Sequence, residues 1–249
     1  MKIFLTLLRR ELAAFFFSVT GYIIIAAVAF LVGLSFVVLI SNLGSDPSPM
    51  PVTEMFYRTY FFWLIVLLAA PVITMRLFAL EKFSGTFETL MTTPVSDLQV
   101  VAAKFTAAMF FYMVMWLPMI ACLFIVRHFT NQSGLDSGTV GGIFLGIFLV
   151  GCLFLSLGCF ASALTRSQMA AAMIALVLGV SLFALGFLAQ ALPAVTQWQS
   201  QVISYFNLFD QMGDFARGVV DTRAVVFYVT AAFCFLFLTL RVIESRRWR

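Results

Sequence analysis

Six uncharged, strongly apolar stretches dominate the sequence and constrain its fold more than any other feature. A helix needs about 20 predominantly apolar residues to cross the hydrocarbon core of a bilayer. With 63% hydrophobic residues and a mean hydropathy of +1.06, the chain is far more apolar than a soluble domain. It is therefore predicted to be an all-α integral membrane protein, a single transmembrane domain over residues 1–249. Three predicted spans are residues 20–40, 60–75 and 105–126, the fourth lies within 138–165, and the last two are 169–190 and 224–240.

The second stretch, 60–75, is the shortest of the six. Pro71 lies inside it, and we expect this proline to kink the helix because it removes a backbone donor. Arg76 follows directly and is expected to close the span.

Small residues recur at four-residue spacing in the fourth and fifth stretches. Such pairs let helix backbones approach closely, so packing within the six-helix unit is the favoured interpretation and a conduction path is the alternative. The pairs are Gly142 with Gly146, Gly158 with Ser162, and Ala175 with Gly179.

Residues 1–18 precede the first span and mix apolar side chains with Lys2, Arg9, Arg10 and Glu11. This mixture is typical of an amphipathic helix that lies in the membrane interface. A cleaved signal peptide is the competing interpretation. The apolar run behind it is long enough to span the membrane and shows no small-residue cleavage site followed by a long soluble domain, so the interfacial helix is favoured.

The distribution of Lys and Arg predicts the orientation, because short basic loops stay on the cytoplasmic side. If both termini are cytoplasmic, only four of the 15 cationic residues lie outside, which leaves 11 inside. These cations flank helix ends beside anionic headgroups and form no single patch, so nucleic-acid binding is excluded as an interpretation. The four outer residues are Arg58, Arg127, Arg217 and Arg223.

A polar segment at 77–96 separates the second and third spans and faces the cytoplasm in this orientation. Gly85 and Pro94 break helical continuity within it, which predicts a short helix between them. Ser96 and Gln99 match a capping box, so the third helix is expected to begin at Ser96. An ordinary solvated loop is the alternative interpretation.

Catalytic and metal-binding motifs are missing from the sequence. A phosphate-binding P-loop needs Lys between Gly and Ser or Thr, but the three lysines follow Met1, Glu81 and Ala103. GxSxG and HExxH are also absent, and the four cysteines form no close CxxC pair. We expect no enzyme activity, no cofactor and no metal in this chain.

The sequence of the polar segment resembles that of the linker after the second transmembrane helix of ABC-2-type transporter permeases, in which the pattern EK-x-SGT-x-E-x-L-x-T-x-PVS recurs. The resemblance implies that residues 1–18 are the elbow helix of such a permease and that 77–96 is the coupling segment against which a separate ATPase docks. The matching positions are Glu81, Lys82, Ser84, Gly85, Thr86, Glu88, Leu90, Thr92, Pro94, Val95 and Ser96. The coupling interface that it implies is Glu81, Lys82, Gly85, Thr86, Glu88, Leu90, Thr93 and Pro94.

A second block resembles the signature of the same family before its last helix. Its positions are Phe215, Arg217, Gly218, Val219, Val220, Asp221 and Arg223. By this resemblance, residues 191–223 are expected to form short re-entrant helices in the outer leaflet. Asp210 and Asp214 share one helical face if that stretch is helical, and we interpret them as a solvated cap.

The resemblance implies the permease subunit of an ATP-driven transporter in the bacterial inner membrane. ATP and Mg would be bound by a partner ABC ATPase, and a second permease subunit, identical or related, would complete the pathway. Among subfamilies, the chain is most similar to gliding-motility-associated permeases. The alternative is a non-transporting membrane scaffold that recruits an ATPase to an assembly or gliding-motility complex, and a passive channel or an integral-membrane enzyme ranks last.

Overall fold

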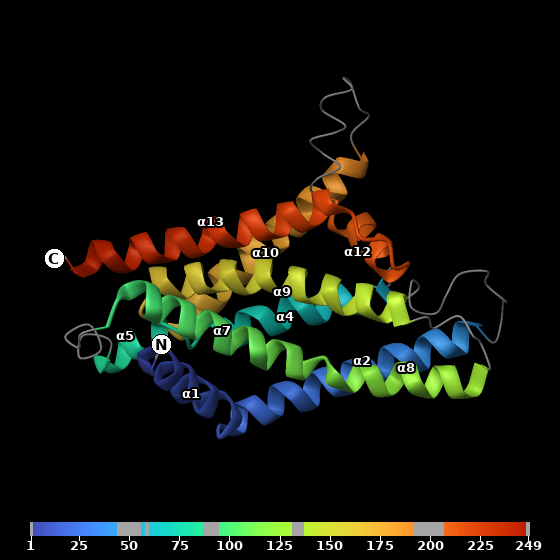
Figure 1. The fold of residues 1–249 in the computed structure, drawn as a ribbon, viewed down its shortest axis with the longest axis horizontal. Helices are drawn as coiled ribbons and strands as arrows, with labels where there is room; N and C mark the ends of the chain where they lie inside the picture. The colour runs from blue at the N-terminus through green and yellow to red at the C-terminus, as the bar shows by residue number, and fades with distance from the viewer. Residues whose placement is uncertain are drawn as a thin grey trace.

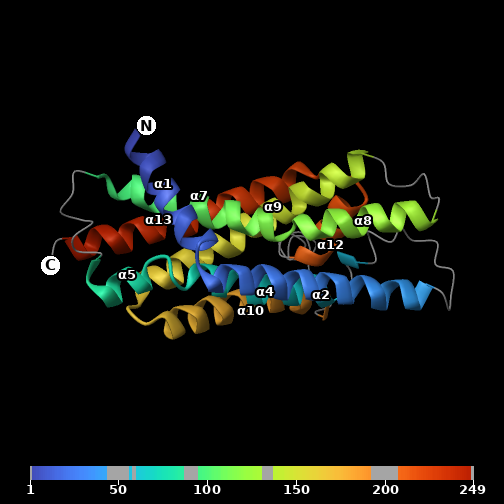
Figure 2. The ribbon, with the colours of Figure 1, turned by 90° about the horizontal axis from the view of Figure 1, so that it is seen from below.

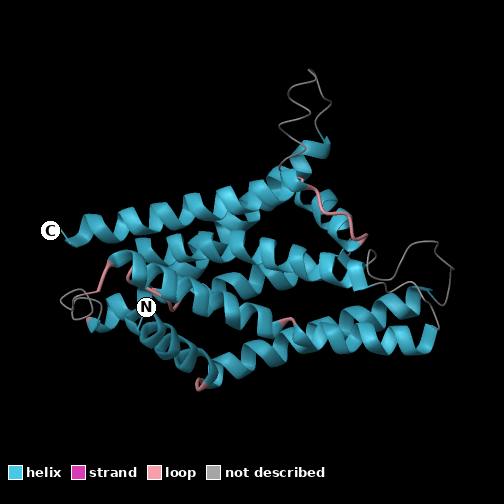
Figure 3. Cartoon of the chain, in the orientation of Figure 1, coloured by secondary structure: helices cyan, strands magenta, loops and turns pink. Residues whose placement is uncertain are grey.

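The computed structural model describes residues 2–43, 56–57, 60–86, 95–130, 137–191 and 207–247. Every regular element in these ranges is a helix, and none of them holds a strand (Figure 3). The helices are α1 (Lys2–Phe16), α2 (Val19–Leu43), α4 (Tyr60–Thr74), α5 (Ala79–Ser84), α7 (Asp97–Met115), α8 (Leu117–Thr130), α9 (Ser137–Leu164), α10 (Gln168–Ala191), α12 (Leu208–Ala216) and α13 (Thr222–Arg247).

Six helical segments of the described chain are long and apolar enough to cross a membrane, which confirms the predicted all-α membrane fold. They are Val19–Ser41, Tyr60–Ser84, Asp97–Ile125, Gly138–Leu164, Gln168–Gly186 and Thr222–Ser245. The second differs from expectation. Helix α4 ends at Thr74, one residue before the predicted end of the second span at residue 75. A turn at 75–78 then leads directly into α5, so the second segment has 25 residues and is not the shortest of the six.

Helix α9 lies at the centre of the bundle and packs against α13, α10, α4, α12 and α7 (Figures 1 and 2). In its most apolar window, 72% of the residues are buried, against 28% for α2 and 22% for each of α10 and α13. The outer helices therefore present long apolar faces to their surroundings, as expected for a protein embedded in lipid.

The small residues of α9 permit this close packing. A Cβ on Gly158 would overlap the side chain of Thr74 in α4. A Cβ on Gly142 would lie 2.7 Å from the Phe215 carbonyl oxygen, and one on Gly146 would lie 2.8 Å from Met212 Sδ. These glycines therefore seat α4 and α12 against α9, as the packing interpretation predicted.

The third span begins as predicted. Ser96 is the N-cap of α7, and its Oγ accepts a hydrogen bond of 3.4 Å from the backbone N–H of Gln99. Asp97 lies in the first turn, where its charge is favourable near the positive end of the helix dipole.

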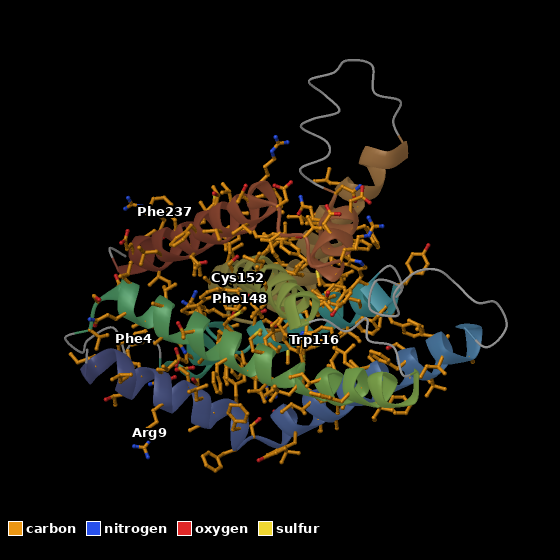
Figure 4. All side chains as sticks on the ribbon, turned by 45° about the vertical axis from the view of Figure 1, so that its right-hand side comes forward. Phe4, Arg9, Trp116, Phe148, Cys152 and Phe237 are labelled. Carbon is orange, nitrogen blue, oxygen red and sulfur yellow. The ribbon has the colours of Figure 1, made fainter. Side chains whose placement is uncertain are left out.

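The same span is interrupted, which the sequence analysis missed. Helix α7 ends at Met115, Trp116 caps it, and α8 starts at Leu117 (Figure 1). Pro118 lacks the backbone N–H that a continuous helix would use to bond the carbonyl four residues earlier. The Trp116 side chain at this junction is fully buried (Figure 4). Its ring centroid lies 5.3 Å from that of Phe62 in α4 and 6.1 Å from that of Tyr112 in α7.

Part of the predicted outer segment, 207–223, is described, whereas 192–206 lies outside the described residues. It contains the short helix α12, which packs on α9 at the end of the bundle opposite α5 and the two chain ends (Figure 1). Asn207 caps α12, and its side-chain amide also donates to the Asp210 carboxylate.

Candidate functional site

Helix α5 lies in the described part of the predicted coupling segment. Gly85 ends it as a left-handed C-cap with a φ of 74°. Glycine adopts this conformation without the steric cost that a side chain would add. The predicted helix break at Gly85 is therefore confirmed, whereas the predicted break at Pro94 and most of the short helix predicted between the two lie outside the described residues.

The start of α5 is fastened to α9 by one hydroxyl group. Ser162 Oγ accepts hydrogen bonds of 3.1 Å from the backbone N–H groups of Phe78 and Ala79, and it lies 3.4 Å from the Met75 carbonyl oxygen, to which it donates. The first N–H groups of a helix lack partners within the helix, so Ser162 supplies what α5 itself cannot. Lys82 Nζ adds a second link by donating to the Ala163 carbonyl oxygen.

Four charged side chains close a ring beside α5. Arg10 Nη2 lies 2.7 Å from Glu11 Oε1 and 2.8 Å from Glu81 Oε1. Lys104 Nζ lies 3.0 Å from Glu11 Oε1 and 2.9 Å from Glu81 Oε1. Cations and anions therefore alternate around the ring, and each glutamate uses a single oxygen to accept from both cations.

The ring is graded from buried to exposed. The Lys104 side chain is only 3% exposed, those of Glu11 and Glu81 are 11% and 17% exposed, and that of Arg10 is 51% exposed. Because an unpaired charge is costly to bury, Lys104 needs both carboxylates. The second oxygen of Glu81, Oε2, is buried without a hydrogen-bond partner among the described residues.

Arg10 stays firmly charged in this arrangement. Its partial burial lowers the pKa of the guanidinium, but the hydrogen bond and charge of Glu11, followed by those of Glu81, outweigh that effect, so the pKa is raised above its ordinary value. The neighbouring Arg9 is exposed and extends away from the bundle (Figure 4).

The ring brings together three elements that are far apart in the sequence. Arg10 and Glu11 come from α1, Glu81 from α5, and Lys104 from α7. Helix α1 also packs along α7, where the rings of Phe15 and Phe111 stack with centroids 5.0 Å apart.

The residues predicted to form the coupling interface divide into three groups. Glu81 and Lys82 are turned inward and partly buried, as described above. Gly85 and Thr86 are exposed at the end of α5. Glu88, Leu90, Thr93 and Pro94 lie outside the described residues.

Phe83 was not among the predicted interface residues. It is 77% exposed on α5, and Leu80 on the same helix is 40% exposed. The signal for Phe83 in the sequence is a large aromatic residue two positions before Gly85, the glycine that ends a short helix. We call four exposed residues of this site, Leu80, Phe83, Gly85 and Thr86, the α5 tip.

The signature before the last helix builds the turn from α12 to α13. Phe215 is 1% exposed against α9, and Arg217 is the C-cap of α12. Gly218 has a φ of 81°, which favours glycine. Asp221 Oδ1 accepts a hydrogen bond of 2.9 Å from the backbone N–H of Arg223, next to the start of α13.

Fold and site together define a multi-pass membrane protein with a polar, ion-paired end to its helical bundle. The ring has alternating charges that neutralise one another, so its chemistry is suited to holding helices together. The family described as "ABC-2 family transporter protein" matches residues 42–243, and the chain belongs to that family. It is thus a membrane subunit of a transporter. No curated protein matches the chain significantly.

Proposed function

We propose that this chain is the permease subunit of an ATP-driven transporter in the bacterial inner membrane, and that a separate ABC ATPase docks on the α5 tip. The observation that carries this proposal is the contrast between the two sides of α5. Its inner side is fastened by Ser162, Lys82 and Glu81, whereas Phe83 on the other side is 77% exposed. An exposed aromatic side chain on a firmly held helix is suited to receive a force from a partner.

The charge distribution supports a cytoplasmic position for the α5 tip. Both chain ends lie at the same end of the bundle as α5 (Figure 1). The cationic residues concentrate toward this end, and such residues remain on the cytoplasmic side. ATP and Mg would be bound by the partner, because the sequence holds no P-loop.

A second permease subunit would complete the transport pathway. The apolar windows of α2, α10 and α13 are only 22% to 28% buried within one chain, which leaves apolar surface for lipid and for such a subunit. The resemblance to gliding-motility-associated permeases is the basis for proposing that subfamily.

Capture of the tagged chain from its native membrane in mild detergent tests this proposal. We expect a P-loop ATPase to copurify, and Phe83→Ala to reduce its recovery by about tenfold, a loss of about 1.4 kcal/mol. Phe17→Ala is the matched control, because Phe17 is 89% exposed but lies between α1 and α2. Absence of an ATPase, or equal recovery with both variants, would contradict docking at the α5 tip.

A further inference from the structure

We propose that Lys104 is a positioning residue that makes α5, α1 and α7 move as one body when the coupling segment is displaced. This inference rests on the proposed function for the source of the displacement. The ionic link that Lys104 makes from α7 to α1 and α5 depends only on contacts within this chain, so it can be tested separately.

Lys104 is the member of the ring that brings in the third span. Helix α1 supplies Arg10 and Glu11, and α5 supplies Glu81, so α7 enters the ring through Lys104 alone. The Lys104 ammonium also lies 5.6 Å from the centroid of the Phe78 ring, directly before α5. One side chain thus links α7 to both the start and the body of α5.

Without Lys104, the remaining ring would be weak. Arg10 would be the one cation of the ring left to pair with the two carboxylates. Its side chain is 51% exposed, so solvent and salt screen its charge. Glu11 and Glu81 would then lie close together after losing one of the two cations of the ring. The ionic link from α5 to α7 would be lost, and the link from α5 to α1 would depend on Arg10.

The other contacts explain how a displacement of α5 reaches the spans. Helix α1 is held along α7 by the stacked rings of Phe15 and Phe111. Arg76, in the turn before α5, donates to Thr20 Oγ1 in the first turn of α2. A body made of α5, α1 and α7 would therefore carry the first and third spans with it.

Paired spin labels on α5 and α7 test directly whether Lys104 holds these two helices together. The exposed positions Ser84 and Leu98 carry the labels, in a chain whose four cysteines are replaced by alanine and which is held in lipid nanodiscs. We expect a narrow distance distribution in the parent chain and a broad one in Lys104→Met. Lys104→Arg, which keeps the charge, should restore the narrow distribution.

The matched control is Arg241→Gln. Arg241 pairs with Glu244 at 3.0 Å, but within α13 and with its side chain 63% exposed. This variant should leave the distribution unchanged. An unchanged distribution in Lys104→Met, or equal broadening in Arg241→Gln, would overturn the inference.

A second measurement separates this inference from the proposed function. In the complex with its ATPase, Lys104→Met should still capture the ATPase. The change in the rate of ATP hydrolysis that the membrane subunit causes should, however, be at least about fivefold smaller in this variant than in the parent chain. Full retention of that effect would count against Lys104. Failure of the parent chain to capture any ATPase would instead reject the proposed function, while the nanodisc distances would still decide the role of Lys104.

Should Lys104→Met fail to accumulate, Arg10→Gln tests the same ring from its exposed side. Labels at Leu5 on α1 and Ser84 on α5 should then show a broader distribution than in the parent chain. An unchanged distribution would show that the ring does not hold α1 to α5.

Discussion

Lys104 Nζ lies 2.9 Å from Glu81 Oε1, and the two side chains are only 3% and 17% exposed. This contact joins α5, the short helix at the end of the second span, to α7, the helix that begins the third. The polar end of the bundle is therefore one charged structure and not a set of independent loops.

Glu11→Gln should destabilise the protein by about 3 kcal/mol, because removing one partner leaves buried charge uncompensated. The Glu11 side chain is 11% exposed and accepts hydrogen bonds from both Lys104 and Arg10. Thermal unfolding in detergent measures the effect. Glu244→Gln is the matched control and should cost less than about 1 kcal/mol, since its pair with Arg241 is exposed. Equal losses in the two variants would contradict the importance of the ring.

Ser162→Ala should loosen α5 from α9 by about 1 to 3 kcal/mol, because the N–H groups of Phe78 and Ala79 lose their acceptor. Amide hydrogen exchange at these two residues should accelerate accordingly. Ser156→Ala on the same helix is the control, since Ser156 is equally buried but its Oγ donates to the Leu153 carbonyl within α9. Slow exchange at Phe78 in Ser162→Ala would show that another group holds the helix.

Gly158→Ala should destabilise the contact between α9 and α4 by about 1 to 3 kcal/mol, because the added Cβ overlaps Thr74 and forces the helices apart. Gly141→Ala is the control on the same helix, where an added Cβ meets nothing within 4 Å. Unfolding midpoints of the two variants should therefore differ. Identical midpoints would mean that α4 can shift without cost.

Gly85→Ala should cost about 1 kcal/mol through backbone strain alone, since its φ is 74° and no atom lies within 4 Å of the added Cβ. Gly33→Ala has the same open space in a regular helix and should be neutral or slightly stabilising. We expect only Gly85→Ala to weaken capture of the ATPase. A Gly85→Ala variant that captures the ATPase as well as the parent would indicate that the shape of this turn is unimportant for docking.

The span count and two boundaries could be predicted because each depends on local chemistry. Apolar length determines which segments can cross a bilayer, the Ser96 hydroxyl reaches a backbone N–H three residues away, and Gly85 tolerates a positive φ. None of these features requires knowledge of another helix.

The ring could not be predicted in the same way, because Glu11 and Lys104 lie 93 residues apart and their pairing depends on how α1 docks. A partial signal was present. Lys104 stands on the helical face of Val100, Val101, Ala107 and Ala108, all of which are buried. A lysine within such an apolar stripe requires an anionic partner, although the stripe does not identify which one.

The central claim, that an ATPase acts on the α5 tip, is tested most directly by photo-crosslinking in cells. Benzoylphenylalanine placed at Phe83, which is 77% exposed, should crosslink to a P-loop ATPase. The same probe at Val219, which is 57% exposed beyond α12 at the opposite end of the bundle, should not. An ATPase crosslink from Val219, or from neither position, would contradict the account.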